Sequence, residues 1–497
     1  MPRPLTAEAE VADELSVVRP DLAARYAAEL PAARAAVLTR LWRALTHEPL
    51  PWVESRDAGG DGVTLRLRDG RRLHGPAPDP YATAAYVTAV RLDDVPQDRP
   101  ARLMTDLAVP HGADLAAELD HSVASLALSR AGQPPHPEEW PESDWEWEQR
   151  VVDGHPYHPN CRSRPGFSVA EQLAHAPEHR PLVGLGLVPV PAETCLVTGA
   201  WPEQLRDGRR VLIPVHPWQA AHVLKRPCEE RLTGHPLMSL RTLALDGGVH
   251  VKTALSARLT SSVRDISVPS VAASMALSAF AVEPAARTDG LLHVTRTLGA
   301  VTDGSPDLAA VLRESPQEYG GPGERVLPVA ALATTELPGS AEWLGEFARL
   351  ALAVGLRLLE LGVALEAHGQ NLLVVLSATG APVRLVYRDL ADIRVSPARL
   401  ARHGIPVPEL PARILTDDVP TLRRKLFGSL VAGALAGTAG SRAALRTALE
   451  TAVRDLPRTP DLAALCEEPL PTKALTLMRL SPGTVGDLWT ELPNPLL

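Results

Sequence analysis

The stretch that decides the fold is Glu366-Ala367-His368-Gly369-Gln370-Asn371, followed by an apolar run at 372–376, a turn, and a second β-prone run that ends on Arg388-Asp389. Two short runs bounded by turn residues predict a β-hairpin. The hairpin would bring the polar side chains at both of its ends together. An amide oxygen and a carboxylate there offer the hard oxygen ligands that Mg²⁺ prefers. An ordinary hairpin with polar ends explains this stretch, taken alone, equally well.

Size and composition limit what the chain can be. Its 497 residues are too many for one core, so two or three domains are expected. Hydrophobic content of 45% with 22% charged residues is typical of a soluble globular protein. Early acidic residues and the lack of a long apolar run argue against a signal peptide and a membrane span, which favours a cytoplasmic protein. A net charge of -9 argues against nucleic acid as the main partner.

Cysteine and lysine usage adds two constraints. Four cysteines lie far apart and predict neither a disulfide framework nor a zinc site. Lysine is rare, because arginine supplies nearly all the positive charge. A lysine inside a polar motif therefore gains weight, since a compact ammonium does what a planar guanidinium cannot. The four lysines are Lys225, Lys252, Lys425 and Lys473.

The order of elements predicts an α+β protein of several domains. We expect a mixed, mainly helical region at 1–150, a central β-rich region at 151–324 and a mainly helical region at 325–497. Within these regions we expect helices at 8–48 separated at Pro20 and Pro31, a hairpin turning on Asp69-Gly70, a helix at 113–130, a Pro-rich boundary segment at 133–153, a helix at 269–282, a long loop at 302–323 and a helix at 341–365. Residues 395–497 read as scaffold helices without chemistry.

A dense polar patch lies at 154–167. His155 and His158 are each followed by a proline that stiffens the loop, and Arg162 and Arg164 follow closely. These side chains are donors suited to an anion. Zinc is the weaker interpretation, because no third Cys, His or acid sits at ligand spacing. The patch therefore predicts a phosphate or carboxylate site.

Residues 249–260 alternate with period two, which predicts a strand with Lys252 and Thr260 on its polar face. A straight strand would hold these two residues about 26 Å apart, too far for one small ligand. Either the strand bends near Ser256, or the two residues touch different ends of a long ligand such as a nucleotide. Residues 260–265 are expected to cap a short helix and to present amides and hydroxyls to an anion.

Taken in order, these motifs resemble the NRPS-independent siderophore synthetases of the IucA/IucC family. One position departs from the family pattern, because the family usually has lysine where this chain has Arg162. The resemblance covers residues 148–394 and rests on Glu148-Gln149, on 154–159, on Pro214-Val215-His216-Pro217-Trp218-Gln219, on 252–264, on 366–371 and on Arg388-Asp389.

The resemblance implies an ATP-dependent ligase of siderophore biosynthesis. Such an enzyme activates a carboxylate of citrate, or of a related polycarboxylate, as an acyl-adenylate and passes the acyl group to an amine, hydroxylamine or alcohol. Its shape is a cupped hand with thumb, fingers and palm, here 1–150, 151–324 and 325–497. The resemblance also implies a homodimer, with ATP and Mg²⁺ as cofactors.

Site residues are implied by the same resemblance. The catalytic residues would be Lys252, Arg264 and His368, with His368 as the candidate base for the second step. Thr260, Arg264 and His368 would bind the carboxylate substrate, and Asn371 and Asp389 would hold the metal. The residues around ATP would be His155, His158, Arg162, Arg164, Lys252, Ser261, Ser262, Arg264 and Gln370.

Two other functions stay open. A kinase-like phosphotransferase also has His and Asn near one strand and Asp at the end of the next. Against it, no Asp base lies between His368 and Asn371, and no Gly-rich loop precedes the Lys252 strand. A homologue that binds a carboxylate or siderophore without catalysis is the third interpretation.

Overall fold

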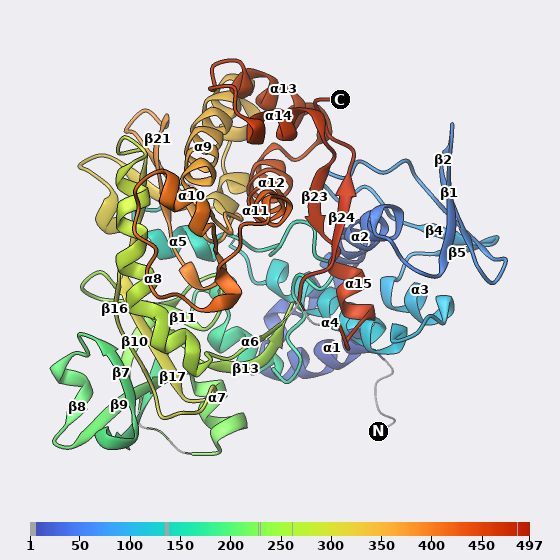
Figure 1. Cartoon of the computed structure of the whole chain (residues 1–497). Helices are drawn as coiled ribbons and strands as arrows, with labels where there is room; N and C mark the ends of the chain where they lie inside the picture. Colours follow the sequence, from blue (N-terminus) through green and yellow to red (C-terminus); the bar gives the residue numbers. More distant parts are fainter. Residues whose placement is uncertain (1–5, 135–138, 227, 229, 261, 485) are drawn as a thin grey trace.

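The computed structural model describes residues 6–134, 139–226, 228, 230–260, 262–484 and 486–497, and Figure 1 shows their arrangement. Helices and strand-rich sheets form an α+β protein, as predicted. Buried side chains gather mainly in three cores, one in the N-terminal part, one under the central sheet and one in the C-terminal part. The site described below lies where the central and C-terminal parts meet.

The N-terminal part packs helices against a small antiparallel sheet of order β1-β2-β3-β4-β5. The predicted turn at Asp69-Gly70 is confirmed, and Gly70 has the positive φ of 90° that this turn requires. The predicted break at Pro31 is wrong: the helix continues through it, because packing of the buried stretch that follows outweighs one lost hydrogen bond. The elements are α1 (Ala7–Val18), α2 (Ala23–His47), β1 (Val53–Gly59), β2 (Gly62–Leu67), β3 (Arg72–Gly75), β4 (Val90–Leu92), β5 (Val95–Gln97), α3 (Pro100–Leu107) and α4 (Gly112–Ala131).

The central part is a nine-stranded sheet in the order β7-β16-β17-β12-β11-β10-β6-β9-β8. The predicted loop at 302–323 is wrong, because it contains β17, which lies inside this sheet between β16 and β12. Turn residues on both sides hide this six-residue strand from a composition-based reading. The strands are β6 (Val183–Pro191), β7 (Leu196–Gly199), β8 (Arg206–Asp207), β9 (Arg210–Val215), β10 (Glu230–Pro236), β11 (Thr242–Leu245), β12 (Val249–Thr253), β16 (Thr297–Thr302) and β17 (Ala309–Glu314), with the short helices α5 (Asp144–Gln149), α6 (Val169–His175) and α7 (Pro217–Gln219) nearby.

Of the two alternatives for residues 249–260, the structure shows the bend, because the strand does not run straight from Lys252 to Thr260. The chain leaves the nine-stranded sheet at Ala254 and continues as β13 (Leu255–Leu259), which pairs with β14 (Ser262–Arg264) in a separate hairpin. The helix predicted at 260–265 is wrong, because Thr260 adopts a left-handed φ of 56° and turns the chain back into a strand.

Helix α8 (Val268–Ala286) runs along one edge of the molecule in Figure 1 and packs against β7, β15 and β16. It is 19 residues long and mostly apolar, so by length and composition alone it could cross a membrane. The expectation that no apolar run reaches this length is therefore wrong. Part of the helix is buried on the sheet, as in the core helix of a globular protein.

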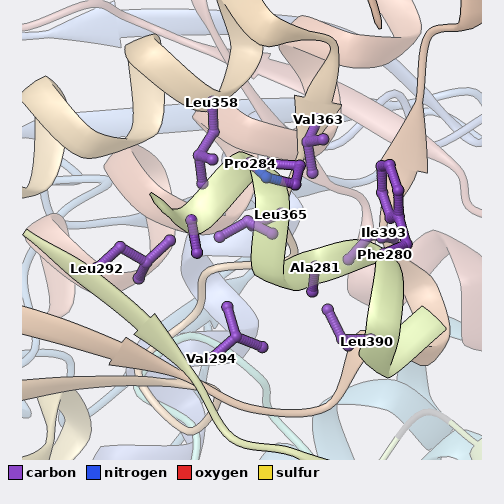
Figure 2. A pocket seen from close by; sticks show the side chains of 11 residues that line it. Phe280, Ala281, Pro284, Leu292, Val294, Leu358, Val363, Leu365, Leu390 and Ile393 are labelled. Carbon is purple, nitrogen blue, oxygen red and sulfur yellow. The ribbon is translucent and has the colours of Figure 1, made fainter. Parts of the chain in front are cut away.

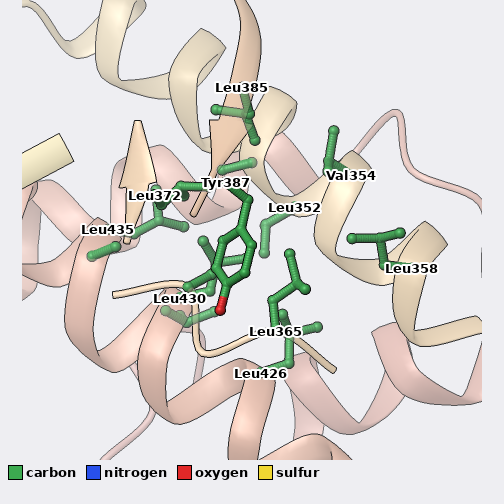
Figure 3. Close-up of a cluster of buried hydrophobic side chains, with 14 of the residues drawn as sticks. Leu352, Val354, Leu358, Leu365, Leu372, Leu385, Tyr387, Leu426, Leu430 and Leu435 are labelled. Atoms are coloured by element: carbon green, nitrogen blue, oxygen red, sulfur yellow. The ribbon is translucent and has the colours of Figure 1, made fainter. Parts of the chain in front are cut away.

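The C-terminal part is built on a four-stranded sheet of order β15-β21-β20-β18. The predicted hairpin at 372–387 is confirmed as β20 and β21. Helix α9 covers the sheet and ends earlier than predicted, at Gly362, whose φ of 107° suits only glycine. Figure 3 shows Tyr387 inside the core between this helix and the following ones. The elements are β15 (Leu292–Val294), β18 (Arg325–Pro328), α9 (Ala341–Leu361), β19 (Val363–Ala364), β20 (Leu372–Leu376), β21 (Pro382–Tyr387), β22 (Arg394–Val395), α10 (Pro397–Arg402), α11 (Val419–Leu426), α12 (Ala436–Ala439), α13 (Arg442–Val453), α14 (Pro460–Glu467), β23 (Leu470–Lys473), α15 (Leu475–Leu480) and β24 (Trp489–Leu492).

Candidate active site

Lys252 and Asp389 form the centre of the site. Lys252 lies on β12 and Asp389 directly after β21, and Lys252 Nζ is 2.5 Å from Asp389 Oδ2. Burial lowers the pKa of Lys252 to about 8. Although burial opposes ionisation, Lys252 and Arg313 hold the pKa of Asp389 well below its usual range. The structure thus joins two residues that the sequence placed in separate motifs.

Arg388, the residue before Asp389, is fixed by several hydrogen bonds and an ion pair. Its guanidinium donates to the carbonyl oxygen of Gln370 at 2.8 and 3.0 Å and lies 2.5 Å from Glu148 Oε1, and its backbone N–H donates to Asn371 O. Both partners of the ion pair are almost fully buried. Glu148 also accepts a hydrogen bond from the backbone of Met238. This clamp ties the β20–β21 hairpin to α5 and to the segment that follows β10.

Two arginines near this centre were missed in the sequence. Arg241 donates from Nη1 to the carbonyl oxygens of Arg264 and Asp265, and its charge acts on both Lys252 and Asp389. Burial lowers its pKa to about 10. Arg313 lies on β17, the strand that was read as a loop. Neither residue belonged to a motif that was singled out.

Thr260 and Arg264 lie together on the β13–β14 hairpin, as their predicted role requires. Arg264 Nη2 donates to Thr260 Oγ1 at 2.8 Å, and the charges of Asp389 and Glu366 act on Arg264. Ser261 lies outside the described residues, and the side chain of Ser262 is likewise not described. The structure therefore does not test the prediction that these serines bind ATP.

The three site histidines share one arrangement. In each of them, Nδ1 accepts a hydrogen bond from a nearby backbone N–H. The donor to His368 is Gln370 at 3.3 Å, and the donor to His158 is Asn160 at 3.0 Å. His155 accepts from both Tyr157 and His158. Burial lowers the pKa of all three rings, so each is neutral. In a neutral ring whose Nδ1 accepts, Nε2 carries the proton. Each ring thus presents an N–H donor, which favours anion binding over the predicted base.

The 154–167 loop meets the 366–371 turn. His368 adds to the lowering of the His155 pKa, and Arg264 adds to burial in lowering the pKa of His158 to about 3. His158 Nε2 is buried with no hydrogen-bond partner among the described residues. An anionic ligand would supply that missing acceptor.

Arg162 and Arg164 point elsewhere. Both guanidinium groups are buried and face Glu178, with Arg164 Nη1 at 2.7 Å and Arg162 Nη1 at 3.5 Å from its carboxylate. Arg162 also donates to the carbonyl oxygens of Val151 and Val152. Phosphate contact by these two arginines stays a prediction, and the geometry shows both side chains holding the loop in place.

The region at 395–497, which is expected to be scaffold, supplies two lysines that lie near the site. Lys425 Nζ lies 3.3 Å and Lys473 Nζ 2.9 Å from Glu366 Oε1, two residues from His368. Lys425 also pairs with Asp392 at 2.7 Å. Three of the four lysines therefore surround the site, and lysine rarity was the signal that could have found them.

One apolar cavity lies beside the site. Figure 2 shows it lined by carbon side chains of α8 and of the segment after Asp389, including Phe280, Ala281, Leu390 and Ile393. Its walls offer no charged or hydrogen-bonding side chain, so it is a packing gap of the core.

Comparison with known proteins finds two family matches along the chain. Residues 143–334 match the IucA / IucC family, and residues 341–486 match the family described as ferric iron reductase FhuF-like transporter. The first match covers the central part of the chain, and the second covers most of its C-terminal part. Both matched segments contribute to the site, since Lys252 lies in the first and Asp389 in the second.

The curated relatives that match this chain are ligases and synthases by name. It is 24% identical to the citryl-spermidine/3,4-dihydroxybenzoyl-citryl-spermidine:spermidine ligase of Bacillus anthracis over 314 residues, 50% of this chain and 51% of that protein. It is 25% identical to the 2-[(L-alanin-3-ylcarbamoyl)methyl]-3-(2-aminoethylcarbamoyl)-2-hydroxypropanoate synthase of Staphylococcus aureus (strain NCTC 8325 / PS 47) over 338 residues, 52% of this chain and 53% of that protein. The chain spans about half the length of the curated relatives it matches.

Solved structures of the family share the fold. The petrobactin biosynthesis protein AsbB from Bacillus anthracis str. Sterne matches with a TM-score of 0.77 and 18% identity, over 99% of this chain and 98% of that chain. The ATP-bound aerobactin synthetase IucA from a hypervirulent pathotype of Klebsiella pneumoniae matches with a TM-score of 0.72 and 20% identity, over 94% and 99%. These matches confirm the α+β architecture of this chain.

Proposed function

We propose that the chain is an ATP-dependent ligase that activates a carboxylate of citrate or a related polycarboxylate as an acyl-adenylate. The observation that carries this proposal is the Lys252–Asp389 pair, set among Arg241, Arg264 and Arg313. One carboxylate among four cations leaves a local excess of positive charge in a chain whose net charge is -9. Such a site suits two anions that must meet, a nucleotide triphosphate and a polycarboxylate. The printed names of the relatives support ligation of this kind.

In the first step a carboxylate oxygen of the substrate attacks the α-phosphorus of ATP, and the bond to the leaving pyrophosphate breaks. No strong base is needed, so catalysis comes from positioning and from charge neutralisation. Lys252 would neutralise the charge on the reacting phosphate. Thr260 and Arg264 would hold the carboxylate, and His368 would donate from Nε2 to an oxygen of either group.

In the second step the nitrogen or oxygen of an amine, hydroxylamine or alcohol attacks the acyl carbon, and AMP leaves. Ligation of an ammonium substrate releases one proton overall. His368 presents an N–H donor in this structure, so we propose that it stabilises the developing oxyanion, and that the proton leaves through solvent.

The donor set at the hairpin end fits Mg²⁺. Asn371 Nδ2 donates to Glu366 O at 3.4 Å, which leaves Oδ1 as the acceptor. Lys252 is the one described residue that hydrogen-bonds to the Asp389 carboxylate. Asn371 and Asp389 would thus supply two hard oxygen ligands, and phosphate and water would supply the rest. When bound, Mg²⁺ would neutralise phosphate charge during pyrophosphate departure.

Two further expectations belong to this proposal. The three parts of the fold would correspond to thumb, fingers and palm, with the site between fingers and palm. The active form would be a homodimer, which light scattering of the purified chain tests directly.

The test is a pyrophosphate-release screen. Citrate, 2-oxoglutarate, succinate and their monoamides would each be paired with diamines and hydroxylamines. Carboxylate-dependent release of pyrophosphate together with AMP is the expected result. Formation of ADP instead would support the kinase-like alternative. If none of the candidate substrates gives pyrophosphate release, the result would support a binding homologue without catalysis.

A further inference from the structure

Arg313 is a largely buried arginine whose side chain has no hydrogen-bond or ion-pair partner among the described residues. The residue is 8% exposed, and its Nε is buried with no hydrogen-bond partner. Across the described residues, no hydrogen bond or ion pair involves this side chain. Burying a charge that is neither paired nor hydrogen-bonded is costly, so folded proteins rarely keep one without use.

The carboxylates near Arg313 are committed to other groups. Asp144 accepts from Ser315 Oγ at 2.7 Å and lies 3.0 Å from His250 Nε2. Glu148 pairs with Arg388. Asp389, whose charge also acts on Arg313, pairs with Lys252. Among the described residues, Arg313 therefore has nearby carboxylates but none that pairs with it directly.

The sheet register directs Arg313 toward the site. His250 on β12 pairs with Arg313 on β17, and Lys252 follows two positions later on the same face of β12. Arg313 therefore shares the sheet face of Lys252, which meets Asp389. Burial and the charge of Arg388 lower the pKa of Arg313 to about 10, so the side chain is still cationic at neutral pH.

The charges around Asp389 fall into two sets. Glu366 and Asp389 act on Arg264 and His368, the residues proposed to hold the carboxylate substrate. Arg388, Glu148, Asp144 and Asp389 act on Arg313. Asp389 belongs to both sets, so its charge acts on Arg264 and on Arg313 alike.

We propose that Arg313 is a phosphate-binding residue of this site, and that it contacts the triphosphate of ATP. This inference rests on the proposed function, because it assumes that ATP reacts beside Lys252. The charges of Arg241 and Arg313 both act on Lys252, and these three cations would share the same phosphates. A planar guanidinium suits this role, because it can donate two parallel hydrogen bonds to a phosphate.

The test is calorimetric titration of magnesium pyrophosphate and of magnesium ATP into the full chain. Arg313→Met is expected to weaken pyrophosphate binding about 10- to 100-fold, the loss of charge-assisted hydrogen bonds in a buried site. The matched control is Arg296→Met, which removes the same charge from an exposed position beside β16 where arginine pairs with Glu314. The control is expected to bind both ligands as the wild type does.

Melting without ligand separates binding from structure. Arg313→Met is expected to melt no lower than the wild type, because it removes an unpaired buried charge. A lower melting temperature with unchanged pyrophosphate affinity would overturn the inference. If Arg313→Met fails to fold, Arg313→Lys replaces it. Equal pyrophosphate affinity of the wild type and Arg313→Lys overturns the inference, and weaker affinity of the variant supports it.

The wild type separates this inference from the proposed function. If the wild type binds neither ligand, the proposed function is overturned as well. If the wild type and Arg313→Met bind with equal affinity, only the inference is overturned.

Discussion

Lys252 Nζ and Asp389 Oδ2 lie 2.5 Å apart and join the nine-stranded sheet to the C-terminal sheet. The two side chains are 137 positions apart in the chain. Both side chains are partly shielded from water, so their attraction is stronger than that of a surface ion pair. The central and C-terminal parts must therefore be docked before the site exists.

Lys252→Met is expected to lower ATP–pyrophosphate exchange about 100- to 1000-fold, because it removes a positive charge aimed at the reacting phosphate. Exchange measured with the carboxylate but no amine isolates the first step. Lys225→Met is the matched control, since Lys225 is an exposed lysine away from the site. Equal losses in both variants would show that Lys252 has no special part in the reaction.

The pH dependence of the first step should report the Lys252 pKa of about 8. Exchange is expected to fall as pH rises through about 8, because the ammonium loses its proton. Stability should change in the opposite direction: the unfolded chain binds more protons between about 8 and 10.4, so the Lys252 contribution to the free energy of unfolding increases across this window. Exchange and unfolding measured in the same buffers separate the two effects. In Lys252→Arg the fall above pH 8 should disappear, and its persistence would assign the titration to another group.

Local sequence signals were sufficient for part of the site. The hairpin that ends at Asp389 was predictable, because turn residues bound two apolar runs. Strand length alone reduced residues 249–260 to two alternatives, a bend near Ser256 or contact with the two ends of a long ligand. These features depend on residues close together in the chain.

Contacts between distant segments were not predictable. Turn residues concealed β17 and with it Arg313, because a six-residue buried strand has no period that separates it from a loop. Lys473 reaches Glu366 only through the packing of β23, which no local pattern encodes. The pairing of Arg162 with Glu178 likewise depends on tertiary structure.

His368→Gln separates a donor from a base. A glutamine amide can place an N–H group near the position of Nε2 but cannot accept a proton at neutral pH. If His368 acts as a donor, His368→Gln should keep a measurable part of both half-reactions, while His368→Ala should lose about 100-fold or more. The comparison uses exchange for the first step and amide formation for the second. If both variants lose amide formation completely but retain exchange, His368 acts as the base of the second step.

Glu148→Gln tests the clamp under Asp389. The substitution leaves the buried Arg388 charge without its partner, so the free energy of unfolding should fall by about 3–5 kcal/mol. Glu314→Gln is the matched control, because Glu314 pairs with an Arg296 side chain that is 66% exposed and such pairs contribute at most about 1 kcal/mol. Chemical denaturation of both variants gives the comparison. Since Arg388 also holds the Gln370 carbonyl, the magnesium concentration needed for half-maximal exchange should rise in Glu148→Gln and stay unchanged in the control. Equal destabilisation in both variants, or an unchanged magnesium requirement, would remove Glu148 from the support of the metal site.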